Sequence, residues 1–103
     1  MVGPAARRRV PLERARGGRG RRGRWMHTLL KVDGFKFYFW TQESFEPAHF
    51  HVSKGSGSAK WWLDPLKEAW AKGLSDEDKA KIGELAAANA GKWLGEWKRV
   101  MGK

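Results

Sequence analysis

The chain has 103 residues, a length that suits one folded domain, and it carries 21 Lys and Arg against 11 Asp and Glu. It contains no cysteine, which excludes disulfides and thiolate metal sites. No stretch approaches the roughly 18 apolar residues that span a bilayer, and no apolar segment follows the basic N-terminus as a secretory signal requires. These features suggest a cytoplasmic protein in a reducing compartment.

The positive charge is concentrated in residues 1–25, which hold nine arginines and a single acid, Glu13. Their Arg and Gly content without apolar periodicity predicts a disordered leader outside the folded domain. Such a leader is typical of an arm that neutralises phosphates or of an Arg-rich transit peptide. A start-site artefact is a third interpretation, and we favour it because the patterned sequence begins at Met26. The predicted domain therefore spans residues 26–103.

Strands are predicted first in this domain. Residues 27–32, 35–41, 49–54 and 59–63 are rich in β-branched and aromatic side chains. Asp33-Gly34 is typical of a two-residue hairpin turn, and a Gly/Ser turn over residues 55–58 separates the last two strands. Because all connections are short, we expect an antiparallel meander of about four strands.

Two or three helices are predicted after the strands. Asp64 can cap a helix over residues 65–72, with Pro65 at its favoured first position. Ser75 followed by Asp78 resembles the capping box of a second helix. Asn89 or Gly91 is expected to interrupt that helix, and an amphipathic segment then continues to residue 101. Strands followed by helices predict an α+β fold with the helices packed on one sheet face.

Alternation along the strands assigns the two faces of the predicted sheet. The core-facing side chains are expected to be Phe35, Phe37, Phe39, Phe50, Val52, Trp61 and Leu63, and Trp70, Trp93 and Trp97 are expected to join the core. The opposite face is expected to carry Lys36, Tyr38, Trp40, His49, His51, Lys60 and Trp62. Two of the three histidines of the chain therefore share a face with aromatic and basic side chains.

The run EPAHFHV, with His49 and His51, has several interpretations. The basic and aromatic face resembles a stacking platform for single-stranded nucleic acid. The two imidazoles could bind a metal with Glu46 or Asp64 as a third ligand, or could act as general acid and base on RNA while Lys60 holds a phosphate. A Trp- and Tyr-rich face is also typical of a protein interface, including a homodimer interface. We expect no metal or other cofactor, because only two nitrogen ligands are assured.

The runs MHTLLKVDGFKFYFW, EPAHFHV and AKWWLDPLKEAW together resemble the bacterial family called domain of unknown function 4160. The resemblance covers residues 26–103. The positions that match its motif are Glu46, Pro47, His49, His51, Val52, Ala59, Lys60, Trp62, Leu63, Asp64 and Pro65. The family has no established activity. Its genes often lie beside those of another small uncharacterised domain, number 2442, in an arrangement like toxin–antitoxin pairs.

The resemblance implies a small component of a toxin–antitoxin-like pair that acts through a protein partner encoded by an adjacent gene. RNA is a second candidate partner. From the residues alone, Glu46, Lys36, Tyr38, Trp40, Lys60 and Trp62 are the candidate binding side chains. His49 and His51 are the candidate catalytic residues of the alternative, a metal-independent ribonuclease. A single-stranded nucleic-acid-binding module is the other alternative.

Overall fold

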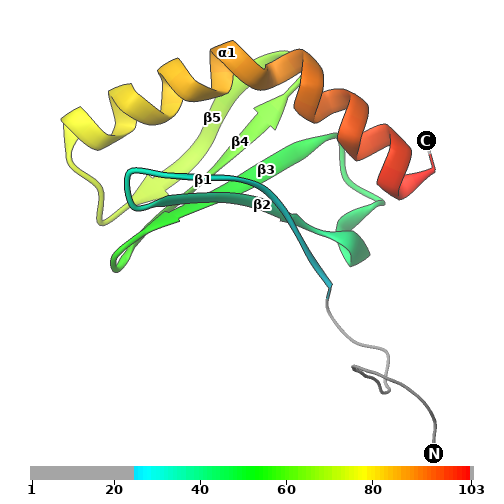
Figure 1. Ribbon diagram of the computed structural model, residues 1–103, viewed down its shortest axis with the longest axis horizontal. Helices are drawn as coiled ribbons and strands as arrows, with labels where there is room; N and C mark the ends of the chain where they lie inside the picture. The colour runs from blue at the N-terminus through cyan, green and yellow to red at the C-terminus, as the bar shows by residue number, and fades with distance from the viewer. Residues whose placement is uncertain (1–24, 103) are drawn as a thin grey trace, which may run out of the picture.

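The computed structural model describes residues 25–102, so nearly all of the predicted leader lies outside the described part of the chain. Five antiparallel strands form one sheet in the order β1-β2-β3-β4-β5, and one long helix follows them (Figure 1). The elements are β1 (Met26–Val32), β2 (Phe35–Trp40), the 3-10 turn η2 (Thr41–Glu43), β3 (His49–Lys54), β4 (Gly57–Leu63), β5 (Leu66–Lys72) and α1 (Asp76–Met101). The α+β class is confirmed, with five strands and one α-helix over residues 25–102 in place of four strands and two or three helices.

The predicted hairpin turn between β1 and β2 is confirmed. Asp33 and Gly34 both have positive φ, 51° and 84°, as a type I′ turn requires at its two central residues. The pairs Val32–Phe35 and Lys31–Lys36 continue directly from the turn. This register places Lys31 and Lys36 side by side on one face of the sheet.

The predicted helix over residues 65–72 is wrong. Leu66–Lys72 is strand β5, and Asp64-Pro65 forms the short turn that connects it to β4. Lys, Glu and Ala favour helix locally, but pairing with the otherwise open edge of β4 satisfies a whole row of backbone groups. The register shift opposite Lys60 and Trp61 lets a strand of irregular pattern stay paired over its length.

The predicted break in the C-terminal helical region is also wrong, because α1 is continuous over 26 residues. Its predicted start is confirmed: Ser75 is the N-cap, and its hydroxyl accepts a hydrogen bond of 3.0 Å from the Asp78 N–H. The Asn89 side chain donates to the Leu85 carbonyl at 2.8 Å, so it bonds within the helix and does not interrupt it. Within residues 25–102 no helix combines the length and apolar character needed to cross a membrane.

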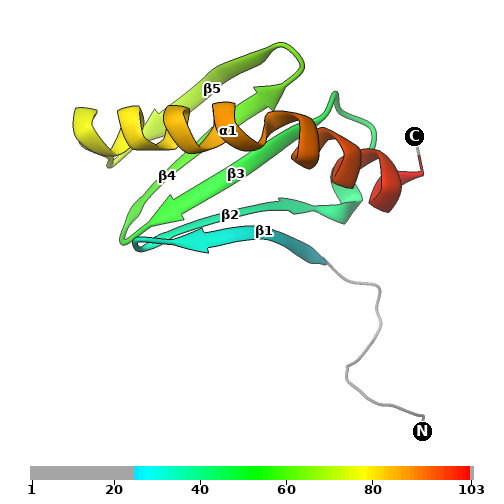
Figure 2. The same cartoon turned by 45° about the horizontal axis from the view of Figure 1, so that its top comes forward.

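The core lies between α1 and one face of the sheet (Figures 1 and 2). The strands contribute Phe35, Phe37, Phe39, Phe50, Val52, Ala59 and Leu63, and the helix contributes Ile82, Ala86, Trp93 and Trp97. The Trp93 ring lies 5.0 Å from that of Phe37 and 5.1 Å from that of Phe50, so it links two strands to the helix. Trp61 is only partly buried at the core margin, and Trp70, which was expected in the core, is 41% exposed on β5.

Candidate functional site

One face of the sheet is left uncovered by the described elements, because α1 lies along the other (Figures 1 and 2). Residues directly opposite in neighbouring strands share a face. Tyr38 pairs with His51, His51 with Lys60, and Lys60 with Trp70. The "open face" is defined here by Lys31, Lys36, Tyr38, Trp40, His51, Lys60, Trp62, Lys67, Trp70 and Lys72.

The side chains of the open face contact one another. The Tyr38 ring stacks on His51 at 5.6 Å between centroids and meets Trp40 edge-on at 5.6 Å. Lysine ammonium groups lie over three of the rings: Lys36 over Tyr38 at 5.9 Å, Lys60 over Trp62 at 4.6 Å, and Lys72 over Trp70 at 5.7 Å. The predicted binding residues are thus on one surface, together with Trp70, Lys67 and Lys72, which the wrong assignment of residues 65–72 to a helix had hidden.

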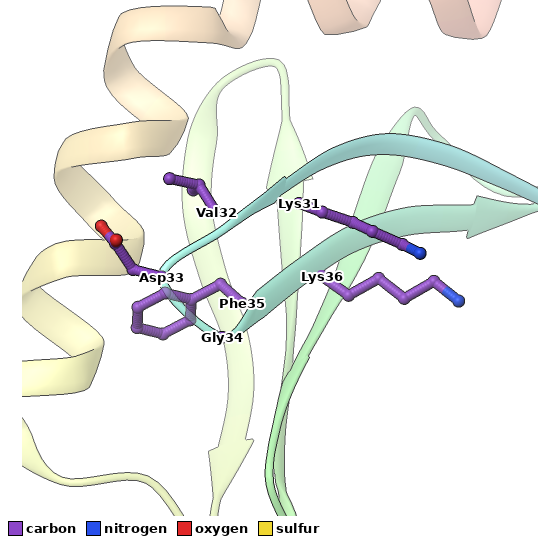
Figure 3. Close-up of a pocket in the computed structure, with 6 residues that line it drawn as sticks. All are labelled: Lys31, Val32, Asp33, Gly34, Phe35 and Lys36. Atoms are coloured by element: carbon purple, nitrogen blue, oxygen red, sulfur yellow. The ribbon is translucent and has the colours of Figure 1, made fainter.

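A surface pocket adjoins this face at the β1–β2 turn and is lined by residues 31–36. Figure 3 shows Lys31 and Lys36 extending side by side from the two strands, away from Phe35. Lys31 and Lys36 are directly opposite each other in the two strands, and like charges in such positions repel. An anion placed between them would relieve that repulsion.

The two histidines of the EPAHFHV run meet on one carboxylate. The Nε2 of His49 lies 2.8 Å from Glu43 Oε1, and the Nε2 of His51 lies 3.0 Å from the same oxygen. Both histidines belong to β3, whereas Glu43 ends the η2 turn that follows β2. The sequence expectation that the two rings point to a common ligand position holds in the structure.

His49 is not on an exposed surface as its strand position predicted: its side chain is fully buried. The ring lies 4.9 Å from that of Trp97 and 5.8 Å from that of Trp62. His49 is the first residue of β3, at the end of the sheet, where the helix C-terminal turns and the loop before β3 close over the strand. A period-two pattern assigns a face but does not reveal what covers the ends of that face.

The hydrogen bonds of His49 determine where its proton lies. Its Nδ1 is 2.9 Å from the Pro47 carbonyl oxygen. A carbonyl oxygen can only accept, so Nδ1 must carry the proton that donates to it. In a neutral ring the Nε2 then has a lone pair that points at Glu43.

The predicted carboxylates have other positions. Glu46 accepts a hydrogen bond from the Lys60 ammonium at 2.6 Å and lies 3.8 Å from His49 Nδ1. Asp64 lies in the β4–β5 turn. The carboxylate that reaches both imidazole Nε2 atoms is Glu43, which sequence reasoning missed. A turn and a loop separate Glu43 from the histidines, so no helix or strand period relates them, and the only signal is an acid in the segment before β3.

The surroundings shift the acid–base properties of this cluster. Burial raises the pKa of the Glu43 carboxyl, but its contacts with the His49 and His51 rings together hold that pKa below its usual value. Burial lowers the pKa of His51, more than Glu43 raises it. Burial and the Glu43 charge raise the pKa of the Tyr38 hydroxyl. Glu43 is therefore ionised and His51 is neutral near pH 7.

Comparison with known proteins gives one result. A family model described as Domain of unknown function (DUF4160) matches residues 34–98, which include β2 to β5 and most of α1. No curated protein and no solved structure matches the chain. The matched region contains Glu43, both histidines of the cluster and nearly all of the open face. Because the match covers more than half of the sequence, the chain belongs to the DUF4160 family.

Proposed function

We propose that this protein is a cytoplasmic binding module of a toxin–antitoxin-like pair, and that its open face binds single-stranded RNA. The observation that supports this proposal is the composition of the open face. Four aromatic side chains and four lysines lie together on the sheet face that α1 does not cover: Tyr38, Trp40, Trp62 and Trp70, with Lys31, Lys36, Lys67 and Lys72. A further lysine of this face, Lys60, is paired with Glu46. The toxin–antitoxin-like setting comes from the family resemblance.

Aromatic rings and lysines have complementary roles on such a surface. Unpaired bases stack on aromatic side chains, each for about 1–3 kcal/mol, while ammonium groups neutralise phosphates. The spacing of neighbouring strands, about 4.8 Å, presents the rings at intervals that successive bases can reach. A single strand rather than a duplex is favoured, because only unstacked bases expose their faces.

A protein partner is the second candidate, and one observation favours it. The Phe45 side chain is 76% exposed in the loop between η2 and β3, beside the acidic Glu43 and Glu46. The open face itself is less suited to a protein, because lysine is depleted in the cores of protein interfaces. A partner encoded by the adjacent gene would bind most readily around Phe45.

Catalysis by His49 and His51 as an acid–base pair receives less support from the geometry. The His49 side chain has no exposed surface, so a substrate cannot reach its ring in this arrangement. Lys60 is engaged with Glu46 at 2.6 Å and is therefore not free to hold a phosphate. We therefore propose binding, with no strand cleavage, as the activity of the open face.

The test is RNA binding by the full chain, with Trp70→Ala and Lys36→Gln as the open-face variants. Trp70 is 41% exposed, so its removal leaves the core intact. Fluorescence anisotropy with a labelled single-stranded oligonucleotide should show affinity weakened roughly 5- to 150-fold in Trp70→Ala, the range expected for one lost stacking contact. Lys36→Gln should reduce the salt dependence of binding, because one phosphate contact is lost.

The matched control is Lys92→Gln, which removes the same charge from an exposed position on α1. All of these variants keep the arginines of residues 1–25, so the contribution of those arginines to RNA affinity is the same in each protein compared. Equal affinities for all three variants and the unchanged chain would contradict RNA binding by the open face. Co-purification with the product of the adjacent gene, lost on Phe45→Ser and kept in Trp70→Ala, would instead support the protein partner.

A further inference from the structure

We propose that Glu43, His49 and His51 form a binding site for a divalent transition-metal ion of the zinc type. This inference does not depend on RNA binding by the open face. The site joins the η2 turn to the start of β3. It reverses our expectation from the sequence, because the structure adds the third ligand that the two histidines lacked.

The donor atoms already converge. One Nε2 from each histidine and a carboxylate oxygen of Glu43 all lie within 4.8 Å of one another. The two N···O distances are 2.8 and 3.0 Å. Zinc binds imidazole nitrogen and carboxylate oxygen at about 2.0–2.2 Å, so tetrahedral ligand atoms lie about 3.3 Å apart. The two nitrogen-to-oxygen distances would therefore need to lengthen by only a few tenths of an ångström to admit the ion.

The His49 ring is held as a metal ligand is usually held. Its Nδ1–H donates to the Pro47 carbonyl at 2.9 Å, which fixes the ring orientation and leaves the Nε2 lone pair for a cation. Burial against Trp97 and Trp62 restrains the same ring. A carbonyl partner on the second nitrogen of a ligating histidine is the common arrangement around protein-bound metals. Pro47 therefore has a defined part in the site: its carbonyl selects the tautomer.

The contact between His49 and Glu43 needs a positive charge. With Nδ1 protonated, a neutral His49 directs a lone pair at a carboxylate oxygen only 2.8 Å away. Two acceptors at that distance repel unless a proton or a metal ion lies between them. A single proton would satisfy one nitrogen and one oxygen. The convergence of the second imidazole, that of His51, on the same oxygen favours an ion that several donors share.

The ligand set indicates which ions would bind. Two imidazole nitrogens and one carboxylate suit zinc and its neighbours in the first transition row rather than magnesium or calcium, which prefer oxygen ligands. Three protein ligands leave a coordination position open. The side chains of Glu43 and His51 are 24% and 14% exposed, whereas that of His49 is fully buried, so the open position faces solvent past Glu43 and His51.

Nearby charges do not compete for this role. Glu46 is drawn toward the Lys60 ammonium at 2.6 Å, so it is a neighbour of the site and not a ligand. The Lys60 charge is compensated by that contact. The ion would therefore be held by one carboxylate charge and two neutral rings, which predicts moderate affinity, below that of thiolate sites.

The experiment is a calorimetric titration of the full chain, first stripped of metal with a chelator, with Zn²⁺ alone. Elemental analysis after gel filtration then measures the zinc that stays bound. We expect one ion per chain and a melting temperature that rises with Zn²⁺ concentration, because the ion binds the folded state. Mg²⁺ at the same concentration should give neither effect. Glu43→Gln and His51→Gln should each weaken Zn²⁺ binding at least about tenfold, in keeping with the loss of one ligand.

His27→Gln is the matched control, because His27 is the one histidine outside the cluster and contacts Glu96 on α1 at 2.9 Å. It should bind Zn²⁺ as the unchanged chain does. Glu43 and His51 are partly exposed, so their variants are expected to fold, and circular dichroism confirms this before titration. Failure of the unchanged chain to take up Zn²⁺, or uptake that is the same in Glu43→Gln and His51→Gln, would overturn the proposal.

Discussion

The tryptophans of the domain differ in solvent exposure, and some lie in the core while Trp70 lies on the surface. Trp93 and Trp97 are 2% and 3% exposed, and both lie where the helix crosses the phenylalanines of the sheet. Trp70 is 41% exposed on the open face, where the Lys72 ammonium lies 5.7 Å from the centre of its ring. The same side chain therefore serves the core in one case and a surface in the other.

We expect Trp93→Ala to destabilise the protein by about 3–5 kcal/mol, the usual cost of removing a large buried aromatic side chain. Trp70→Ala should change the free energy of unfolding by only about 0.5 kcal/mol, because no cavity forms. Urea denaturation followed by circular dichroism measures both. Comparable losses of stability in the two variants would mean that Trp70 packs against something in the folded chain and is not available on the open face.

The histidine cluster shows what could be predicted at the scale of residues. The common direction of His49 and His51 follows from strand alternation and was predictable. The burial of His49 was not, because it depends on Trp97, which is 48 positions away in the sequence. The identity of Glu43 as the shared carboxylate depends on the path of the η2 turn, which has no periodic signal. His49→Ala should therefore also destabilise the protein, whereas the same substitution at an exposed position would have little effect.

At the scale of elements, α1 is a single helix that tolerates glycines. A Cβ added at Gly91 would meet nothing within 4 Å, and the residue is exposed in the helix interior. Its cost there is only about 1 kcal/mol relative to alanine, which the packing of Trp93 and Ala86 on the sheet exceeds. Sequence reasoning expected a break at this glycine because propensity is visible in the sequence and tertiary packing is not.

Gly91→Ala should stabilise the protein by about 0.5–1 kcal/mol, since alanine restricts the unfolded chain and favours the helix. Gly57→Ala is the contrasting substitution. Its Cβ would lie 2.3 Å from the Gly73 carbonyl oxygen, so the start of β4 and the end of β5 would have to move apart. Thermal denaturation should therefore show opposite shifts for the two variants. A lower melting temperature for Gly91→Ala would argue against a continuous helix.

The β5 strand shows a different limit of sequence reasoning. Leu66–Lys72 contains good helix formers after an Asp-Pro pair, which is also a typical helix start. The deciding factor is the free edge of β4, which only exists once the meander has formed. Pairing along that edge overrides local propensity and adds Lys67, Trp70 and Lys72 to the open face.

At the scale of the whole molecule, ion pairs connect the sheet to both halves of the helix. Lys54 of β3 donates to Asp78 in the first turn of α1 at 2.8 Å, and this contact lowers the pKa of the Asp78 carboxyl. Near the other end, His27 of β1 contacts Glu96 at 2.9 Å. Glu96 also accepts two hydrogen bonds from Arg99, of 3.0 and 2.7 Å. The first strand and the last helical turns are thereby joined across 69 positions of sequence.

Glu96 predicts how stability changes with pH. Hydrogen bonds from Arg99, and then from His27, lower the pKa of its carboxyl from 4.5 to about 2. A carboxyl with a lowered pKa in the folded state adds stability above its ordinary pKa and loses that contribution as pH falls through the folded value. The contribution of Glu96 should therefore be complete above pH 4.5 and should vanish as pH approaches 2.

We expect Glu96→Gln to lower the urea midpoint at pH 6 and to have little effect near pH 2, where the native carboxyl is itself becoming protonated. The measurement is a series of urea denaturation curves of both proteins between these pH values. Glu84→Gln is the control on the same helix: its carboxylate is 73% exposed and pairs with Lys81 at 3.4 Å, so its midpoint should follow that of the unchanged chain throughout. A difference between Glu96→Gln and the unchanged chain that stays constant down to pH 2 would show that the lost interaction is packing of the side chain. Only a difference that closes with acid identifies the ionised carboxylate, which contacts Arg99 and His27, as the source of the lost stability.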